Sequence, residues 1–180
     1  MSYPTLNQLT RAEELFNDGN LEEALEVLND ERHFEGLSLQ QRSYSQFLKG
    51  LIFFYLNKGE DLISLGQGIH KEGQKYKNNL QSCDGLIFII TGLAIAGKFD
   101  EANNFFDEIK SLIKSLSNVS KEIITQRKAR LSVVKAFVEL RGSKVELVEE
   151  SLLWILKSQE KFDESYEIIW ANLIMASYVT

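Results

Sequence analysis

The chain has 180 residues, of which 44% are hydrophobic and 26% are charged, and its formal net charge is −6 at pH 7. This length allows one domain with a hydrophobic core, and the composition is ordinary for a soluble globular protein. A single proline, Pro4, leaves the rest of the chain without an obligatory helix breaker, which favours an all-α fold. The single cysteine, Cys83, excludes an intramolecular disulfide.

The N-terminus lacks the basic start and apolar run of a secretory signal, so we expect a cytoplasmic protein. The longest apolar run, residues 85–97, is shorter than the roughly 20 residues that cross a bilayer. This run therefore predicts a buried core helix and no membrane insertion.

Glycines separate consecutive helical segments at intervals of 40, 38 and 45 residues, at Gly19, Gly59, Gly97 and Gly142. One helix pair per period of this length is typical of α-solenoids. We therefore expect a single domain, 1–180, with about four helix pairs and a C-terminal helix. The expected pairs are at about 5–36, 38–77, 80–116 and 119–158, and the terminal helix is at 162–178.

In the first pair, we expect helices at 5–17 and 21–32. Thr5 and Gln8 have the spacing of a capping box, in which each side chain satisfies the other residue's exposed backbone amide. This spacing predicts that the first helix begins at Thr5.

The second pair begins with the same spacing, at Ser38 and Gln41. Its second helix, at about 61–76, contains Gly66, Gly68 and Gly73, and each glycine costs roughly 1 kcal/mol in a helix interior. We expect this helix to be either the most mobile or the most closely packed.

The third pair spans about 80–97 and 99–115, and its first helix is apolar nearly all round, which predicts a central position. The fourth pair spans about 119–141 and then continues from a capping box at Ser143 and Glu146 to about residue 158. Across this last pair we expect contacts between two apolar stripes, formed by Leu131, Val134 and Val138 and by Val145, Val148 and Leu152.

The C-terminal helix is apolar on more than one side, whereas the end of a solenoid normally carries a polar outer face. One stripe contains Tyr166, Ile169, Trp170 and Leu173. This helix either packs back onto its own chain or buries a face against another chain, as in a homodimer or longer assembly. The candidate oligomer-interface residues are Ile168, Trp170, Met175 and Val179.

Charge is unevenly distributed. Residues 1–36 hold nine acidic residues against two arginines, whereas residues 109–138 hold seven basic residues against one acidic residue. These segments are either solvated helix faces or docking sites, for an acidic partner or for head-to-tail contact between copies. The acidic overall balance and the lack of a recognisable module disfavour nucleic acid as a partner.

The third pair carries a recurrent order of apolar, small and aromatic residues: Leu86, Ile89, Ile90, Leu93, Gly97, Ala102 and Phe106. The first pair follows the same order more loosely, with Gln8, Arg11, Ala12, Leu15, Gly19, Ala24 and Leu28. This order resembles the tetratricopeptide repeat family.

The resemblance implies a right-handed α-α superhelix without a cofactor, which acts as a scaffold that binds a partner protein or peptide. It also implies that the inner faces of the first helices hold the partner. These faces would contain Glu13, Asn17, Lys49, Phe53, Asn57, Asp84, Ile87, Thr91, Ser132 and Glu139.

The sequence predicts no catalytic residue and no metal ligand. His33 and His70 both lack the Glu-x-x-His spacing of helical di-metal proteins, and no local pattern supplies a base for Cys83. Three functions are left open: an interaction scaffold, a structural subunit assembled through the C-terminal helix, and an all-helical enzyme.

Overall fold

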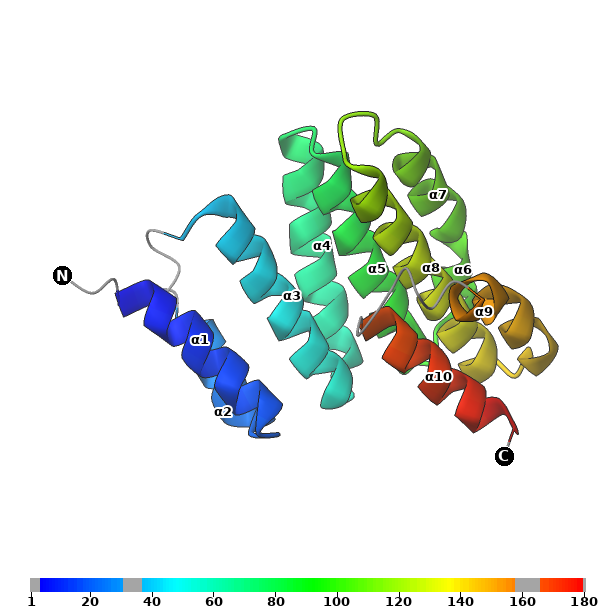
Figure 1. The fold of residues 1–180 in the computed structure, drawn as a ribbon, viewed down its shortest axis with the longest axis horizontal. Coiled ribbons are helices and arrows are strands. Elements are labelled where there is room, and N and C mark those ends of the chain that lie inside the picture. Colours follow the sequence, from blue (N-terminus) through cyan, green and yellow to red (C-terminus); the bar gives the residue numbers. More distant parts are fainter. Residues whose placement is uncertain (1–3, 31–36, 158–165, 180) are drawn as a thin grey trace. The chain divides into compact units, whose positions relative to one another are not determined.

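The computed structural model describes residues 4–30, 37–157 and 166–179, and within these ranges every regular element is a helix (Figure 1). The predicted all-α class is therefore confirmed for the described chain. The residues group into two compact units, and the chain passes from the first to the second between Lys58 and Gly59. The single domain expected from the sequence stays a prediction.

The first unit contains three helices: α1 (Pro4–Asn17), α2 (Leu21–Asn29) and α3 (Leu39–Tyr55). The capping box predicted at Thr5 is wrong, because Pro4 is already the first helical residue, a position that suits its fixed φ. The capping box at Ser38 and Gln41 is confirmed, with both reciprocal hydrogen bonds present. α2 ends before the predicted residue 32, because Asp30 is extended.

Two contacts join α1 to α3 in the first unit. The Tyr44 hydroxyl donates a hydrogen bond of 2.6 Å to Glu13 Oε1. The rings of Phe16 and Tyr55 lie with their centroids 5.8 Å apart. These contacts complement the α1–α2 hairpin, whose buried residues include Ala24.

The second unit contains α4 (Gly59–Lys75), α5 (Asn79–Ile95), α6 (Phe99–Asn104), α7 (Phe106–Lys114), α8 (Lys121–Arg141), the short 3-10 helix η2 (Val145–Leu147), α9 (Val148–Leu156) and α10 (Tyr166–Val179). The single helix expected at 99–115 is divided at Phe105, where the backbone N–H bonds to Ala102, three residues back. The capping box predicted at Ser143 and Glu146 is wrong, because Ser143 has a φ of 58° and α9 begins only at Val148.

Five turns in the described chain share one backbone pattern, in which a single residue adopts a left-handed conformation and the next N–H bonds to a carbonyl five residues back. Each of these closing hydrogen bonds is 2.8 Å long. The left-handed residues are Gly19, Asn57, Lys77, Gly97 and Ser143.

Gly59 and Gly142 do not have the turn role that the sequence predicted. Gly59 is the first residue of α4, and Gly142 has a φ of −84°. The left-handed residues at these turns are Asn57 and Ser143. The predicted turns thus exist, but glycine does not supply the unusual backbone angle in two of them.

α4 and α5 approach each other closely through glycines. An added Cβ at Gly66 would lie 2.6 Å from the Gly85 carbonyl oxygen, and one at Gly92 would lie 2.6 Å from the Gly59 carbonyl oxygen. A Cβ at Gly73 would lie 2.5 Å from the backbone nitrogen of Ser82. Of the two properties expected for α4, the structure supports close packing.

α5 lies at the centre of the larger core cluster, as its apolar run predicted, and every residue from Gly85 to Ala94 is buried. α6 and α7 contribute Ala102, Phe106 and Ile109 to this cluster. α8 contributes Leu131, Val134 and Val138. These three residues therefore pack in the α5 cluster, and the contact expected between them and the α9 stripe is wrong.

A second cluster joins α8, α9 and α10. α8 supplies Ala129, Val133 and Ala136 to it, α9 supplies Val148, Leu152 and Ile155, and α10 supplies Ala171 and Ile174. α8 thus buries two faces, one in each cluster. α10 packs onto its own chain, which is one of the two alternatives predicted from the sequence.

Candidate interaction surface

The partner-facing residues predicted on α5 make internal contacts. Thr91 and Ile87 are buried, and the Thr91 hydroxyl donates a hydrogen bond of 2.7 Å to the Ile87 carbonyl. Asp84 is half-buried and forms an ion pair with Arg127 of α8. These contacts use the side chains that the resemblance assigned to a partner.

The Asp84–Arg127 pair has two points of contact. Arg127 Nη2 donates a hydrogen bond of 2.9 Å to Asp84 Oδ2, and Arg127 Nε lies 2.6 Å from Oδ1, outside hydrogen-bonding angles. Burial and the Asp84 carboxylate raise the pKa of the neighbouring Cys83 thiol to about 12, although Arg127 opposes this change. The buried thiol therefore stays protonated and is a poor nucleophile.

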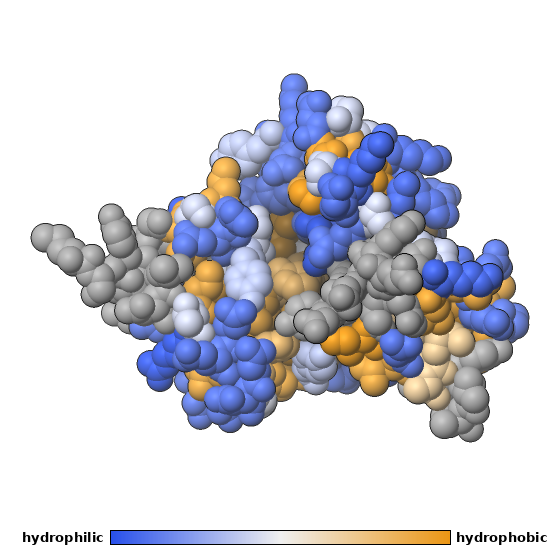
Figure 2. All heavy atoms as spheres, viewed as in Figure 1, coloured by the Kyte–Doolittle hydropathy of each residue, from blue (hydrophilic) through white to orange (hydrophobic). Residues whose placement is uncertain are grey.

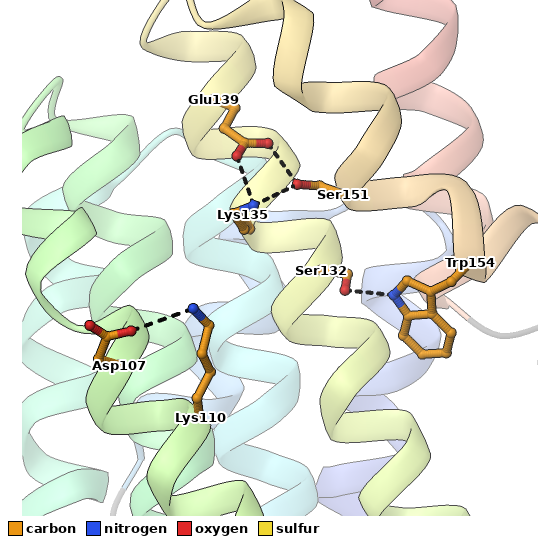
Figure 3. Close-up of polar contacts among 7 residues, drawn as sticks. All are labelled: Asp107, Lys110, Ser132, Lys135, Glu139, Ser151 and Trp154. Carbon is orange, nitrogen blue, oxygen red and sulfur yellow. Dashed lines mark hydrogen bonds and ion pairs between the residues drawn. The ribbon is translucent and has the colours of Figure 1, made fainter.

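Glu139, another predicted partner residue, lies in a polar cluster between α8 and α9 (Figure 3). Its side chain is only 6% exposed. It accepts a hydrogen bond of 2.8 Å from the Ser151 hydroxyl and lies 3.1 Å from Lys135 Nζ. Lys135 Nζ also donates to the Ser151 oxygen over 3.2 Å, so the three groups close a triangle that ties α8 to α9.

Ser132 makes a second polar link between the same helices. Its hydroxyl oxygen accepts a hydrogen bond of 2.8 Å from the Trp154 indole nitrogen (Figure 3). This contact satisfies the indole donor where the ring is partly buried. Ser132 and Glu139 are therefore both engaged by α9.

Of the residues predicted on the first unit, all but Phe53 are half-buried or exposed. Glu13 is half-buried beside Tyr44, and Asn17 is exposed. Lys49 Nζ lies 5.7 Å from the centre of the Phe53 ring, and Phe53 itself is buried. Asn57 lies beyond the end of α3 in a left-handed turn conformation. Their roles in partner binding stay predictions.

The exposed face of α10 differs from the predicted interface residues. Met175 packs against the α8–α9–α10 cluster, and the side chains of Ile168, Trp170 and Val179 lie outside the described part of the chain. Ile169 and Leu173 are 49% and 51% exposed, and Figure 2 shows hydrophobic surface along α10. The sequence placed these two residues on an apolar stripe but did not select them as interface candidates.

Part of the basic segment 109–138 is neutralised by nearby carboxylates. Lys110 pairs with Asp107 (Figure 3), Arg127 with Asp84 and Lys135 with Glu139. The positive surface is therefore smaller than the sequence count implies.

The described chain contains no group of three or more His, Cys, Asp or Glu residues that could hold a metal ion. His70 Nδ1 lies 3.1 Å from the Ser82 carbonyl, so it must be the protonated nitrogen because a carbonyl only accepts. His70 Nε2 contacts Gln74 at 2.8 Å and lies 3.6 Å from Glu108. His33 lies outside the described residues.

Among the described helices, none has the length and apolar character needed to span a membrane. No protein-family model, curated protein or solved structure matches this chain. The resemblance to the tetratricopeptide repeat family therefore stays a prediction, as do the implied superhelix and function.

Proposed function

We propose that the protein is a non-enzymatic scaffold of helical hairpins that binds a segment of a partner protein through the outer face of α10. One observation carries this proposal: Ile169 and Leu173 are about half exposed, while Ala171 and Ile174 of the same helix are buried. The exposed described residues of α10 are all uncharged: Ile169, Asn172, Leu173 and Ala176. Large apolar side chains with little charge are typical of the centre of a protein interface.

A helical-repeat arrangement is part of the proposal. The left-handed turn residues at positions 19, 57, 97 and 143 recur at intervals close to the length of one helix pair, and a fifth, Lys77, lies in the turn that joins α4 to α5. This recurrence supports a chain built from hairpins of similar construction. The tetratricopeptide-like superhelix is the specific form that we propose.

The same face supports a second candidate function, a structural subunit of an oligomer. A two-fold contact would place α10 of one copy against α10 of another, because such an interface uses the same patch twice. An uncharged face suits this contact, since two copies of a chain with net charge −6 repel each other elsewhere.

The burial of Ser151 argues against it as a nucleophile, and so against the enzyme alternative at this site. A serine nucleophile must be accessible to its substrate as well as to a base. Here the hydroxyl donates to Glu139, and Lys135 is engaged with the same carboxylate. We assign this cluster a structural role in holding α9 on α8.

The test uses the double variant Ile169→Asp and Leu173→Asp. The matched control, Gln67→Glu and Asn104→Asp, adds the same charge at exposed polar positions outside α10. Light scattering over a concentration series measures self-association, and quantitative affinity capture measures partners. We expect the α10 variant, but not the control, to lose the captured partner while the wild type stays monomeric.

Concentration-dependent assembly of the wild type that the α10 variant abolishes would favour the subunit function instead. Equal capture by the wild type, the α10 variant and the control would refute both functions for this face. Circular dichroism of each variant checks that its helices are intact.

A further inference from the structure

One end of the second unit brings together two turns that are far apart in the sequence. The α4–α5 turn and the α7–α8 connection both lie at the top of Figure 1. They are joined by a hydrogen bond of 2.8 Å from the Asn79 side-chain amide to the Ser115 hydroxyl. This contact places the two turns side by side, and we call residues 71–79 and 114–121 together the lysine end.

The lysine end is strongly basic. Its five lysines, all exposed, are Lys71, Lys75, Lys77, Lys114 and Lys121. None of them has an ion-pair partner among the residues that the structure describes. The one acidic residue in these two segments, Glu72, accepts a hydrogen bond of 2.7 Å from Gln81.

One neighbouring carboxylate offsets part of this charge. Glu122 follows Lys121 at the start of α8, where its own backbone N–H and the Ser120 hydroxyl lower its pKa and so favour its negative form. Tyr76 is 64% exposed, and Lys75 Nζ lies 5.1 Å from the centre of its ring. The lysine end thus combines positive charge with an accessible aromatic ring, and Figure 2 shows mainly hydrophilic surface at the top of the molecule.

The chemistry of this surface selects the class of partner. Arginine is the preferred residue for bidentate recognition of phosphates, whereas the exposed cations here are lysines, which act as hydrated point charges. The chain as a whole is acidic, with a pI of about 5.1, and would repel a long polyanion beyond this small area. A short acidic segment fits the area without that repulsion.

We propose that the lysine end binds an acidic segment of a partner protein. The lysines attract its carboxylates, and Tyr76 provides an apolar contact at the centre of the basic surface. The surface is built from α4, α5, α7 and α8 turns and contains no residue of α10. This interaction therefore does not depend on the proposed function of the α10 face.

The experiment measures fluorescence polarisation of a labelled peptide of about 15 residues, rich in aspartate and glutamate, at about 0.15 M salt. The test variant combines Lys75→Gln, Lys114→Gln and Lys121→Gln. The control combines Lys58→Gln, Lys144→Gln and Lys157→Gln, which are also exposed and change the net charge equally. The replacements remove charge without reversing it, so the fold is retained.

We expect the test variant to bind the peptide at least roughly tenfold more weakly than the wild type, and the control to differ by less than about twofold. Affinity should fall as salt increases. The variant Tyr76→Ser should also weaken binding, and the α10 double variant should bind like the wild type. That last comparison separates this proposal from the function proposed for α10.

Equal losses in the test variant and the control would overturn the proposal, because binding would then follow net charge alone. Undetectable peptide binding by the wild type would also overturn it. Tighter binding of a single-stranded RNA of equal charge, or of vesicles rich in phosphatidylserine, would overturn the proposal of a protein partner. It would indicate that the lysine end binds a nucleic acid or a membrane surface. Salt-sensitive self-association that only the test variant loses would replace the partner by a second copy.

Discussion

A single methyl group added at Gly85 should force α4 and α5 apart. The Cβ of an alanine there would lie 2.5 Å from the backbone nitrogen of His70 and 2.7 Å from the carbonyl oxygen of Gly66, whereas ordinary contacts begin at 3.4 Å. Both neighbours are backbone atoms, so no side-chain rotation relieves the clash. The two helices must separate by about 1 Å along much of their contact.

The expected loss of stability follows from two opposing effects. Overpacking of a tight contact typically costs about 1–3 kcal/mol, and the upper end applies here because the clash is with backbone. Replacing a helical glycine by alanine returns about 1 kcal/mol through helix propensity. We therefore expect Gly85→Ala to lower the free energy of unfolding by about 2 kcal/mol.

Gly68 provides a matched control in the same helix pair. It is exposed in α4, and an added Cβ would have no heavy atom within 4 Å. Gly68→Ala should therefore show the propensity gain alone, a stabilisation of up to about 1 kcal/mol. Glycine-to-alanine replacement should thus lower the free energy of unfolding at Gly85 and raise it at Gly68.

Urea unfolding followed by tryptophan fluorescence measures this difference, because both tryptophans, Trp154 and Trp170, belong to the second unit. The unfolding midpoint should fall for Gly85→Ala and rise for Gly68→Ala. If Gly85→Ala were as stable as the wild type, the close approach of α4 and α5 through glycine would be refuted.

Three further predictions concern particular residues. Lys77→Gly and Ser143→Gly should each stabilise the protein by about 1 kcal/mol, since a left-handed residue with a Cβ is strained; a lower urea midpoint would contradict this. Ser151→Ala should cost about 1–3 kcal/mol in the free energy of unfolding, because it removes a hydrogen bond from the buried Glu139 carboxylate; an unchanged midpoint would argue that water replaces the hydroxyl. Cys83 should resist a thiol reagent at pH 8 until urea unfolds the chain, and stability should decline as the pH rises from 9.0 towards about 12, because the unfolded thiol ionises first; rapid reaction of the folded protein would contradict the buried position.

Local signals predicted the helices unevenly. The apolar run after Gly85 became the central helix, but of three expected capping boxes only that at Ser38 and Gln41 formed, and those at Thr5 and Ser143 did not. The prediction that a glycine lies at each turn was less successful. Asn57 and Ser143 adopt the left-handed turn conformation although they are not glycines. The predicted positions of these turns were nevertheless close, because Asn57 and Ser143 lie within two residues of the predicted Gly59 and Gly142.

The choice of helix faces was harder to predict. Periodicity places Leu131, Val134 and Val138 on one face of α8, but it does not show that this face packs in the α5 cluster while the Val133 face packs with α9. The lysine end was predicted only in part, because the basic segment 109–138 contains Lys114 and Lys121 but no residue of α4. Lys75 and Lys114 are far apart in the chain, and the Asn79–Ser115 contact brings their turns together. Counting charge in one sequence window cannot detect the contribution of the other turn.

One face of α10 is buried in the core and the other is half exposed, and this decides how the helix should be tested. Ala171 and Ile174 complete the core cluster with α8 and α9, so removing the helix would expose Val148, Leu152 and Ile155 together. A truncated chain would then lose association for reasons of folding as well as binding. Substitutions at the half-exposed Ile169 and Leu173 leave that cluster intact, and only they can assign a loss of association to the outer face itself.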